Sequence, residues 1–143
     1  MTIHERQLLR YDSGSNDSNR ILIFYSDLGL KVLARSNQIY GDGTFDTVAR
    51  IFFQLYSIHA DVFGYTFPCI YALCLRKTRT THEHIYSHLI ESSSGTILNF
   101  SPESIMVDFE VAAINVIKNK FPNSVIKGCL FHVNQSLWSK IQE

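Results

Sequence analysis

The stretch that organises this chain is QIYGDGTFDTVARIFFQLYSIHADVFGYTFPCIYALCL, residues 38–75. It holds three segments rich in the β-branched and aromatic residues that favour strands, at 38–45, 50–60 and 66–75. The link between the second and third segments, ADVFGY (60–65), contains a glycine and is typical of a hairpin turn. Pro68 lies near the start of the third segment, where a missing backbone donor is tolerated. Three consecutive strands with short links predict an antiparallel meander.

The pattern changes after residue 75. Helical spacing predicts a helix over 80–91, and SIMVDF (104–109) is a short buried-strand candidate. EVAAINVIKNKF (110–121) predicts an amphipathic helix that ends before Pro122, with one face formed by Val111, Ile114, Ile117 and Phe121. SVIKGCLF (124–131) predicts a strand, and HVNQSLWSKIQ (132–142) a final helix.

The residues before 38 predict two further elements. RILIF (20–24) has strand character, and SDLGLKVLARS (26–36) predicts a helix with Ser26 as its N-cap. We expect Leu28, Val32 and Leu33 on the apolar face of that helix. The small polar run DSGSNDSN (12–19) is typical of a linker or turn. We therefore expect a flexible N-terminal tail over 1–19 and one domain over 20–143.

An antiparallel meander followed by a β-α-β continuation predicts an α/β fold with a mixed sheet. Right-handed crossovers place the later strands parallel to the first strand of the meander and beside it. We therefore expect the strand at 38–45 to lie next to the strand at 104–109. Asp42 and Asp108, far apart in the sequence, then become candidate neighbours in space.

The composition limits the function classes. Of 143 residues 45% are hydrophobic and 18% charged, which suits one packed domain. Thirteen basic residues balance thirteen acidic ones, so no broad basic surface is expected to hold a polyanion. Three cysteines make no disulfide framework, and the polar start MTIHERQLLR is no signal peptide. The longest uncharged apolar run, between Asp61 and Arg76, is shorter than the ~18–20 residues of a spanning helix. We expect an intracellular, soluble protein without membrane contact.

Asp42 and Asp108 each have two interpretations. Gly-Asp-Gly is good turn chemistry, yet strand formers flank Asp42 on both sides. Asp108 suits the N-cap of the following helix, but it also stands at the carboxyl end of a central strand, where open α/β sheets place ligands. Two carboxylates on adjacent strands repel each other unless a cation or proton lies between them. Together they predict a site for a hard divalent cation, as in phosphoryl transfer.

Other candidate ligands form weaker patterns. Cys129 and His132 make a C-x-x-H pair, which is half of a structural zinc set, and we expect it to hold no metal by itself. Cys69 and Cys74 lie on a predicted strand and are expected in the core. His82, His84 and His88 cluster on one predicted helix, with His84 and His88 on one face at i, i+4 spacing, and we interpret the cluster as a solvated polar face. Asp46 lies past Phe45, toward the end of its strand.

Five motifs occur in an order that resembles the transposase domain of Mutator-like elements (MULE). They are DGTF (42–45), QLYSIHA (54–60), PxxYALxLxK (68–77), VDFEVAA (107–113) and FPNSVIKGCLFHxxQ (121–135). The resemblance covers about residues 20–142.

The resemblance implies a ribonuclease H-like fold, with a three-strand antiparallel meander followed by α-β-α-β-α. It implies a DDE-type site in which two aspartates and a later glutamate bind Mg²⁺ or Mn²⁺ for DNA cleavage and strand transfer. Asp42 matches the first aspartate and Asp108 the second, while Cys129 and His132 match the C-x-x-H of the family. The partners implied are transposon ends and target DNA, with a homo-oligomer in the full-length family context and a nuclear location.

The sequence departs from the family at its third acid. The family glutamate lies well beyond the C-x-x-H, whereas the chain stops at Glu143, too early for that role. We therefore expect a partial core, truncated at the C-terminus and weak or inactive alone. The alternative is a domesticated, non-catalytic module that binds DNA or protein. An unrelated α/β phosphohydrolase would keep the paired acids but leave the other motifs unexplained.

Overall fold

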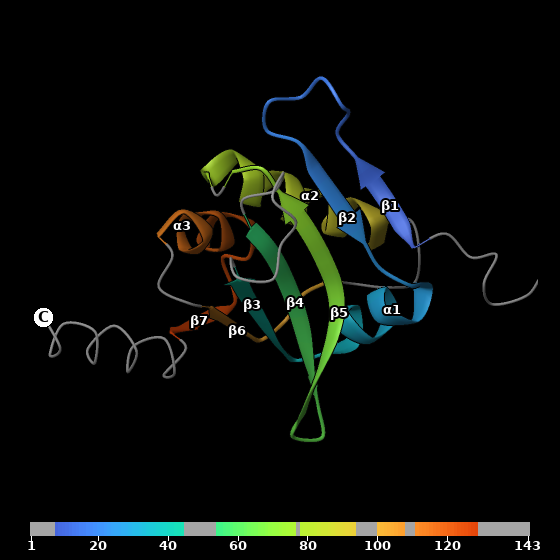
Figure 1. The fold of residues 1–143 in the computed structure, drawn as a ribbon. Helices are drawn as coiled ribbons and strands as arrows, with labels where there is room; N and C mark the ends of the chain where they lie inside the picture. The colour runs from blue at the N-terminus through green and yellow to red at the C-terminus, as the bar shows by residue number, and fades with distance from the viewer. Residues whose placement is uncertain (1–7, 45–53, 77, 94–99, 108–110, 129–143) are drawn as a thin grey trace, which may run out of the picture.

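The computed structural model describes residues 8–44, 54–76, 78–93, 100–107 and 111–128. Within these ranges seven strands form one sheet in the order β1-β2-β5-β4-β3-β6-β7. The strands are β1 Leu9–Asp12, β2 Ile21–Phe24, β3 Gln38–Thr44, β4 Gln54–Val62, β5 Tyr65–Cys74, β6 Ser104–Val107 and β7 Val125–Gly128. The helices are α1 Asp27–Arg35, α2 Arg79–Ser93 and α3 Val111–Lys120. The prediction of an α/β fold with a mixed sheet is confirmed (Figure 1).

The meander forms as predicted. Strand β3 pairs antiparallel with β4, and β4 pairs antiparallel with β5. Val62 pairs with Tyr65, so the hairpin between β4 and β5 turns on two residues, Phe63 and Gly64. This hairpin extends beyond the rest of the sheet, at the bottom of Figure 1.

The crossover is also confirmed. Strand β6 lies beside β3 and parallel to it, with Gln38 level with Ser104 and Gly41 level with Val107. Strand β7 in turn pairs parallel with β6. The sheet is therefore antiparallel from β1 to β3 and parallel from β3 to β7.

The core lies between one face of the sheet and the helices. Ile39, Ile58, Ile70 and Ile105 point from four adjacent strands into this layer and are fully buried. Helix α1 contacts β4, β5 and α2, and α2 contacts α3, so the three described helices form a single layer (Figure 1). Because side chains alternate along a strand, the neighbours of these isoleucines point to the opposite face.

Two helical faces differ from the prediction. Leu28 on α1 and Val111 on α3 are each 68% exposed, whereas the buried residues are Leu30, Leu33 and Ala34 on α1 and Ala113, Val116 and Ile117 on α3. Each buried set has the i, i+3, i+4 spacing of one helical stripe. Leu28 is five residues from Leu33, about 140° around the helix, so it lies outside that stripe. The N-cap prediction is confirmed, since Ser26 Oγ accepts from Gly29 N at 2.9 Å.

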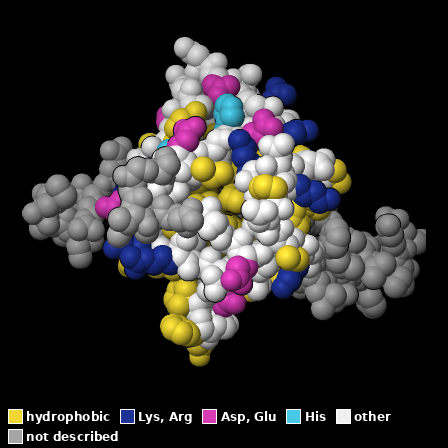
Figure 2. Space-filling model, turned by 180° about the vertical axis from the view of Figure 1, so that it is seen from behind, with side chains coloured by type: hydrophobic (Ala, Val, Ile, Leu, Met, Phe, Trp, Pro, Cys, Tyr) yellow, Lys and Arg dark blue, Asp and Glu magenta, His cyan; other side chains and the backbone are white. Residues whose placement is uncertain are grey.

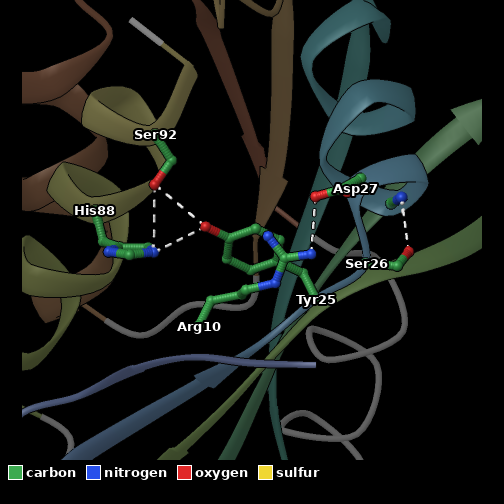
Figure 3. A network of polar contacts seen from close by, with 7 residues as sticks. Arg10, Tyr25, Ser26, Asp27, His88 and Ser92 are labelled. Atoms are coloured by element: carbon green, nitrogen blue, oxygen red, sulfur yellow. Dashed lines mark hydrogen bonds and ion pairs between the residues drawn. The ribbon is translucent and has the colours of Figure 1, made fainter. Parts of the chain in front are cut away.

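Strand β1 was not expected, because it lies within the segment that we assigned to the N-terminal tail. It pairs antiparallel with β2 at the edge of the sheet. The Arg20 guanidinium donates to both oxygens of Asp12 across this hairpin and lowers the pKa of that carboxyl to about 2. Arg10 forms an ion pair with Asp27 at 2.8 Å and lies over the Tyr25 ring (Figure 3).

The predicted final helix, 132–142, lies outside the described residues. Among the helices that the structure describes, none is long and apolar enough to cross a membrane.

Candidate functional site

Asp42 lies near the carboxyl end of β3, between an antiparallel and a parallel neighbour. It is opposite Ser57 of β4 and is half-buried. Ile39 and Gly41 point into the core, so alternation places Asp42 with Tyr40 on the face that the described helices leave uncovered. The strand interpretation of this stretch is therefore confirmed over the turn interpretation.

Gly41 has a packing role that the sequence did not reveal. A Cβ at this position would lie 2.3 Å from the Tyr56 hydroxyl and 2.9 Å from the Tyr86 hydroxyl. These two tyrosines are buried in the core and share a hydrogen bond at 2.9 Å. The absent side chain at this position therefore makes room for two tyrosine hydroxyls against the backbone.

Polar side chains accompany Asp42 on its own face. Ser57 Oγ lies 3.5 Å from the Asp42 carbonyl oxygen as a donor, and it shares a hydrogen bond with His59 Nε2 at 2.9 Å. Burial lowers the pKa of His59, and the negative charge of Asp42 acts in the opposite direction. Sequence reasoning did not include Ser57 and His59 in the site. The signal was present, because S-x-H on a strand puts both side chains on one face.

The parallel neighbour of Asp42 ends beside it. Val107, the last residue of β6, is level with Gly41, and Asp108 is the next residue in the sequence. Asp108, Cys129 and His132 lie outside the described residues. The adjacency of the two strands is thus confirmed, while the pairing of the two carboxylates and any role of the C-x-x-H pair stay predictions.

Asp42 supplies part of what a divalent cation requires. No group of three or more His, Cys, Asp or Glu side chains in the described ranges could hold a metal ion. Magnesium is held by one or two carboxylates and keeps its remaining positions for water and phosphate oxygens. Asp42, a hard oxygen ligand on a hydrogen-bonded strand, fits one such position, and the end of β6 is where a second would have to lie.

The histidines of α2 differ from the solvated face that we expected. His82 is fully buried, with its ring 4.8 Å from the Tyr56 ring. His88 is half-buried, and its Nε2 lies 3.0 Å from the Tyr25 hydroxyl and 3.3 Å from Ser92 Oγ (Figure 3). Only His84 of the three is exposed. These rings serve the packing of α2 rather than a metal site.

The cysteines of β5 are core residues, as predicted. Cys69 and Cys74 are both buried. Burial raises the pKa of the Cys69 thiol, which makes it a poor nucleophile.

The chain matches a known protein family. A family model described as the MULE transposase domain matches residues 38–136. No curated protein matches the chain. The match begins at the first residue of β3 and includes β4 to β7, α2 and α3, while β1, β2 and α1 precede it.

Proposed function

This chain belongs to the MULE transposase domain family, and on that premise we propose that it forms the metal-dependent core of a DDE-type transposase. The fold of this core would be ribonuclease H-like, and its substrates would be transposon ends and target DNA. The observation that carries the proposal is the register of β3 and β6. Gly41 is level with Val107 on two hydrogen-bonded parallel strands, and Asp42 and Asp108 are the residues that follow them in the sequence.

The proposed roles follow from that register. Asp42 and Asp108 would hold Mg²⁺ or Mn²⁺, and the pairing of β3 with β4 and β6 would fix the Asp42 backbone. A divalent cation in such a site activates the attacking oxygen and stabilises the leaving oxygen of a phosphodiester. Ser57 and His59 would border the phosphate on the same face of the sheet.

Thermal unfolding with and without divalent cations tests the metal site. We expect Mg²⁺ or Mn²⁺ at about ten times its Kd to stabilise the chain by ~1.4 kcal/mol, a shift of a few degrees in Tm. Asp42→Asn and Asp108→Asn should each abolish the shift. Asp61→Asn is the matched control, because it lies at the far end of β4 and an asparagine oxygen can still accept from Gly64 N. A shift that survives both site substitutions would overturn the proposal.

A strand-transfer assay with supplied element ends tests the chemistry separately. Product that requires Mn²⁺ and disappears in Asp42→Asn would support catalysis by these carboxylates. Product that persists in that variant would contradict it.

The balance of charges favours a second candidate, a domesticated module that keeps the fold without the chemistry. Thirteen basic and thirteen acidic residues give the chain no general attraction for DNA. This candidate predicts no metal-dependent rise in Tm for the unsubstituted chain, so the unfolding experiment separates the two.

A further inference from the structure

The tip of the β4–β5 hairpin exposes three aromatic side chains. Phe63 is 97% exposed, Tyr65 72% and Phe67 49%. Figure 2 shows hydrophobic side chains gathered at this projecting end of the molecule. We call Phe63, Tyr65 and Phe67 the aromatic tip. A cluster of large apolar side chains on a projecting hairpin marks an interaction site more often than a scattered exposed residue does.

The backbone of the turn makes Phe63 unusual. Phe63 has a φ of 51° and Gly64 a φ of 84°. Two-residue hairpins with positive φ at both positions favour Asn-Gly, whereas a bulky residue in the left-handed region is disfavoured. Phe63 therefore combines a strained backbone with an exposed ring, and neither favours the isolated fold. Strain of this kind is a reason to look for a function.

The charge around the tip argues for a protein partner. No lysine or arginine occurs between Arg50 and Arg76, and Asp61 lies at the base of the turn. Apolar wedges that enter DNA are accompanied by Arg or Lys that contact the backbone. A hairpin without a cation and with an acid at its base does not fit that chemistry.

A pocket of matching size lies in the same chain. Its volume is about 330 Å³, and it lies between the residues before β6 and the turn from α3 to β7. Its apolar walls are Phe100, Pro102, Phe121 and Pro122, and its rim carries both charges, Lys120 and Glu103. A cavity of about 150 Å³ is enough for benzene, so this pocket accommodates a phenyl ring.

The aromatic tip and the pocket lie at the same end of the sheet, where β3 and β6 begin and β4 turns into β5. Ser36 Oγ donates to the Asp61 carbonyl at 3.1 Å, which joins the base of the hairpin to the start of β3. Glu103 N donates to the Asn37 carbonyl at 2.8 Å, which joins the pocket wall to the same point. Asp42 lies near the opposite end of β3, away from the aromatic tip and the pocket.

We propose that a second copy of this chain occupies the pocket, through a two-fold dimer in which each aromatic tip enters the pocket of the other copy. A two-fold dimer uses the same surface on both copies, so a projecting group and a pocket at one end of the molecule can each be matched by the other copy. Aromatic side chains bury about 150–250 Å² each, so the six side chains of two tips give on the order of 1,200 Å². That area is at the lower end of stable interfaces, and we expect a concentration-dependent dimer.

Analytical ultracentrifugation of the full chain and of Phe63→Asn tests the proposal. Because Asn-Gly suits the turn, the variant should unfold at a higher temperature than the unsubstituted chain. It should nevertheless raise the dimer Kd by at least about tenfold, because buried aromatic anchors dominate interfaces. Leu28→Asn removes an apolar side chain that is 68% exposed on α1 and should leave the Kd unchanged. A monomer at every concentration, or an unchanged Kd in Phe63→Asn, would overturn the proposal.

A mixing experiment tests the exchange itself. Ser101→Trp places a large ring at an exposed position of the pocket wall and should also weaken the dimer. A mixture of Ser101→Trp and Phe63→Asn chains retains one intact tip and one intact pocket. The mixture should associate more tightly than either variant alone. If it associates no more than the separate variants, the reciprocal arrangement is wrong.

Discussion

At the residue scale, Gly41 carries a constraint from the core rather than from the site beside it. We expect Gly41→Ala to destabilise the fold by about 1–3 kcal/mol, because the new Cβ would overlap the Tyr56 hydroxyl. In the Tyr56→Phe background the same change should cost less, since the nearest obstructing atom is gone. Urea unfolding of the two single variants and the double variant measures this coupling.

The matched control for that cycle is Tyr71→Phe, which removes a hydroxyl from a partly exposed ring on β5. In this background the loss of unfolding free energy caused by Gly41→Ala should be as large as in the unsubstituted chain. Equal costs of Gly41→Ala in the Tyr56→Phe background and in the unsubstituted chain would show that the tyrosine pair does not require the glycine.

Residue patterns predicted part of the site. The strand placement of Asp42 followed from the strand formers around it, and it is confirmed. Ser57 and His59 were missed because the predicted meander made their strand a neighbour of Asp42 but did not give the register that places Ser57 opposite it. The packing role of Gly41 was also out of reach, since Tyr56 and Tyr86 are brought to it only by the tertiary fold.

At the element scale, α2 is joined to the N-terminal strands by His88. Its Nε2 lies near the Tyr25 hydroxyl and Ser92 Oγ, and its ring packs on Tyr11 of β1. Burial lowers the pKa of His88 below the ordinary 6.5, and Glu91 partly opposes this shift. The unfolded chain therefore takes up the proton at a higher pH than the folded chain. Stability is fully present above about pH 6.5 and falls as the pH drops toward the folded pKa.

We expect urea unfolding between pH 7.5 and about 5.5 to show this loss, with a weaker dependence in His88→Gln. His59 has a pKa lowered by burial in the same direction, so His88→Gln should reduce the pH dependence without removing it. The double variant with His59→Gln should be the least pH-dependent of the set. An unchanged pH profile in His88→Gln would exclude this junction as its source.

The elements that the sequence predicted best are those with long apolar periodicity or clear caps. Helix α1 begins after Ser26, and β4 and β5 follow their aromatic and β-branched runs. Strand β1 was missed because LRYD is short and half charged, so only its pairing with β2 reveals it. The family match begins at β3, yet β2 pairs with β5 inside the same sheet. The first two strands are thus part of this fold although the family match does not cover them.

At the scale of the whole molecule, the strand order was predictable because chain connectivity permits few arrangements. A right-handed crossover after an antiparallel meander leaves one place for β6, beside β3. The exposed tip of the hairpin was not predictable, because VFGYTF has the composition of an ordinary buried strand end. Only the register of β4 and β5 shows that these rings extend beyond the layer that could bury them.

The charge of the whole molecule leads to a prediction about DNA. Lysine and arginine balance aspartate and glutamate, and Figure 2 shows both signs interspersed over one face. We therefore expect random duplex DNA to bind with a Kd weaker than about 10⁻⁵ M near physiological salt, with few phosphate contacts and a shallow dependence of log K on log salt. Fluorescence anisotropy over a salt series measures both quantities. Glu83→Lys with Glu91→Lys, which reverses two charges on α2, should bind more tightly and confirm that the assay responds to charge. Micromolar binding of the unsubstituted chain with a steep salt dependence would mean that its cations gather on one surface despite their balanced number.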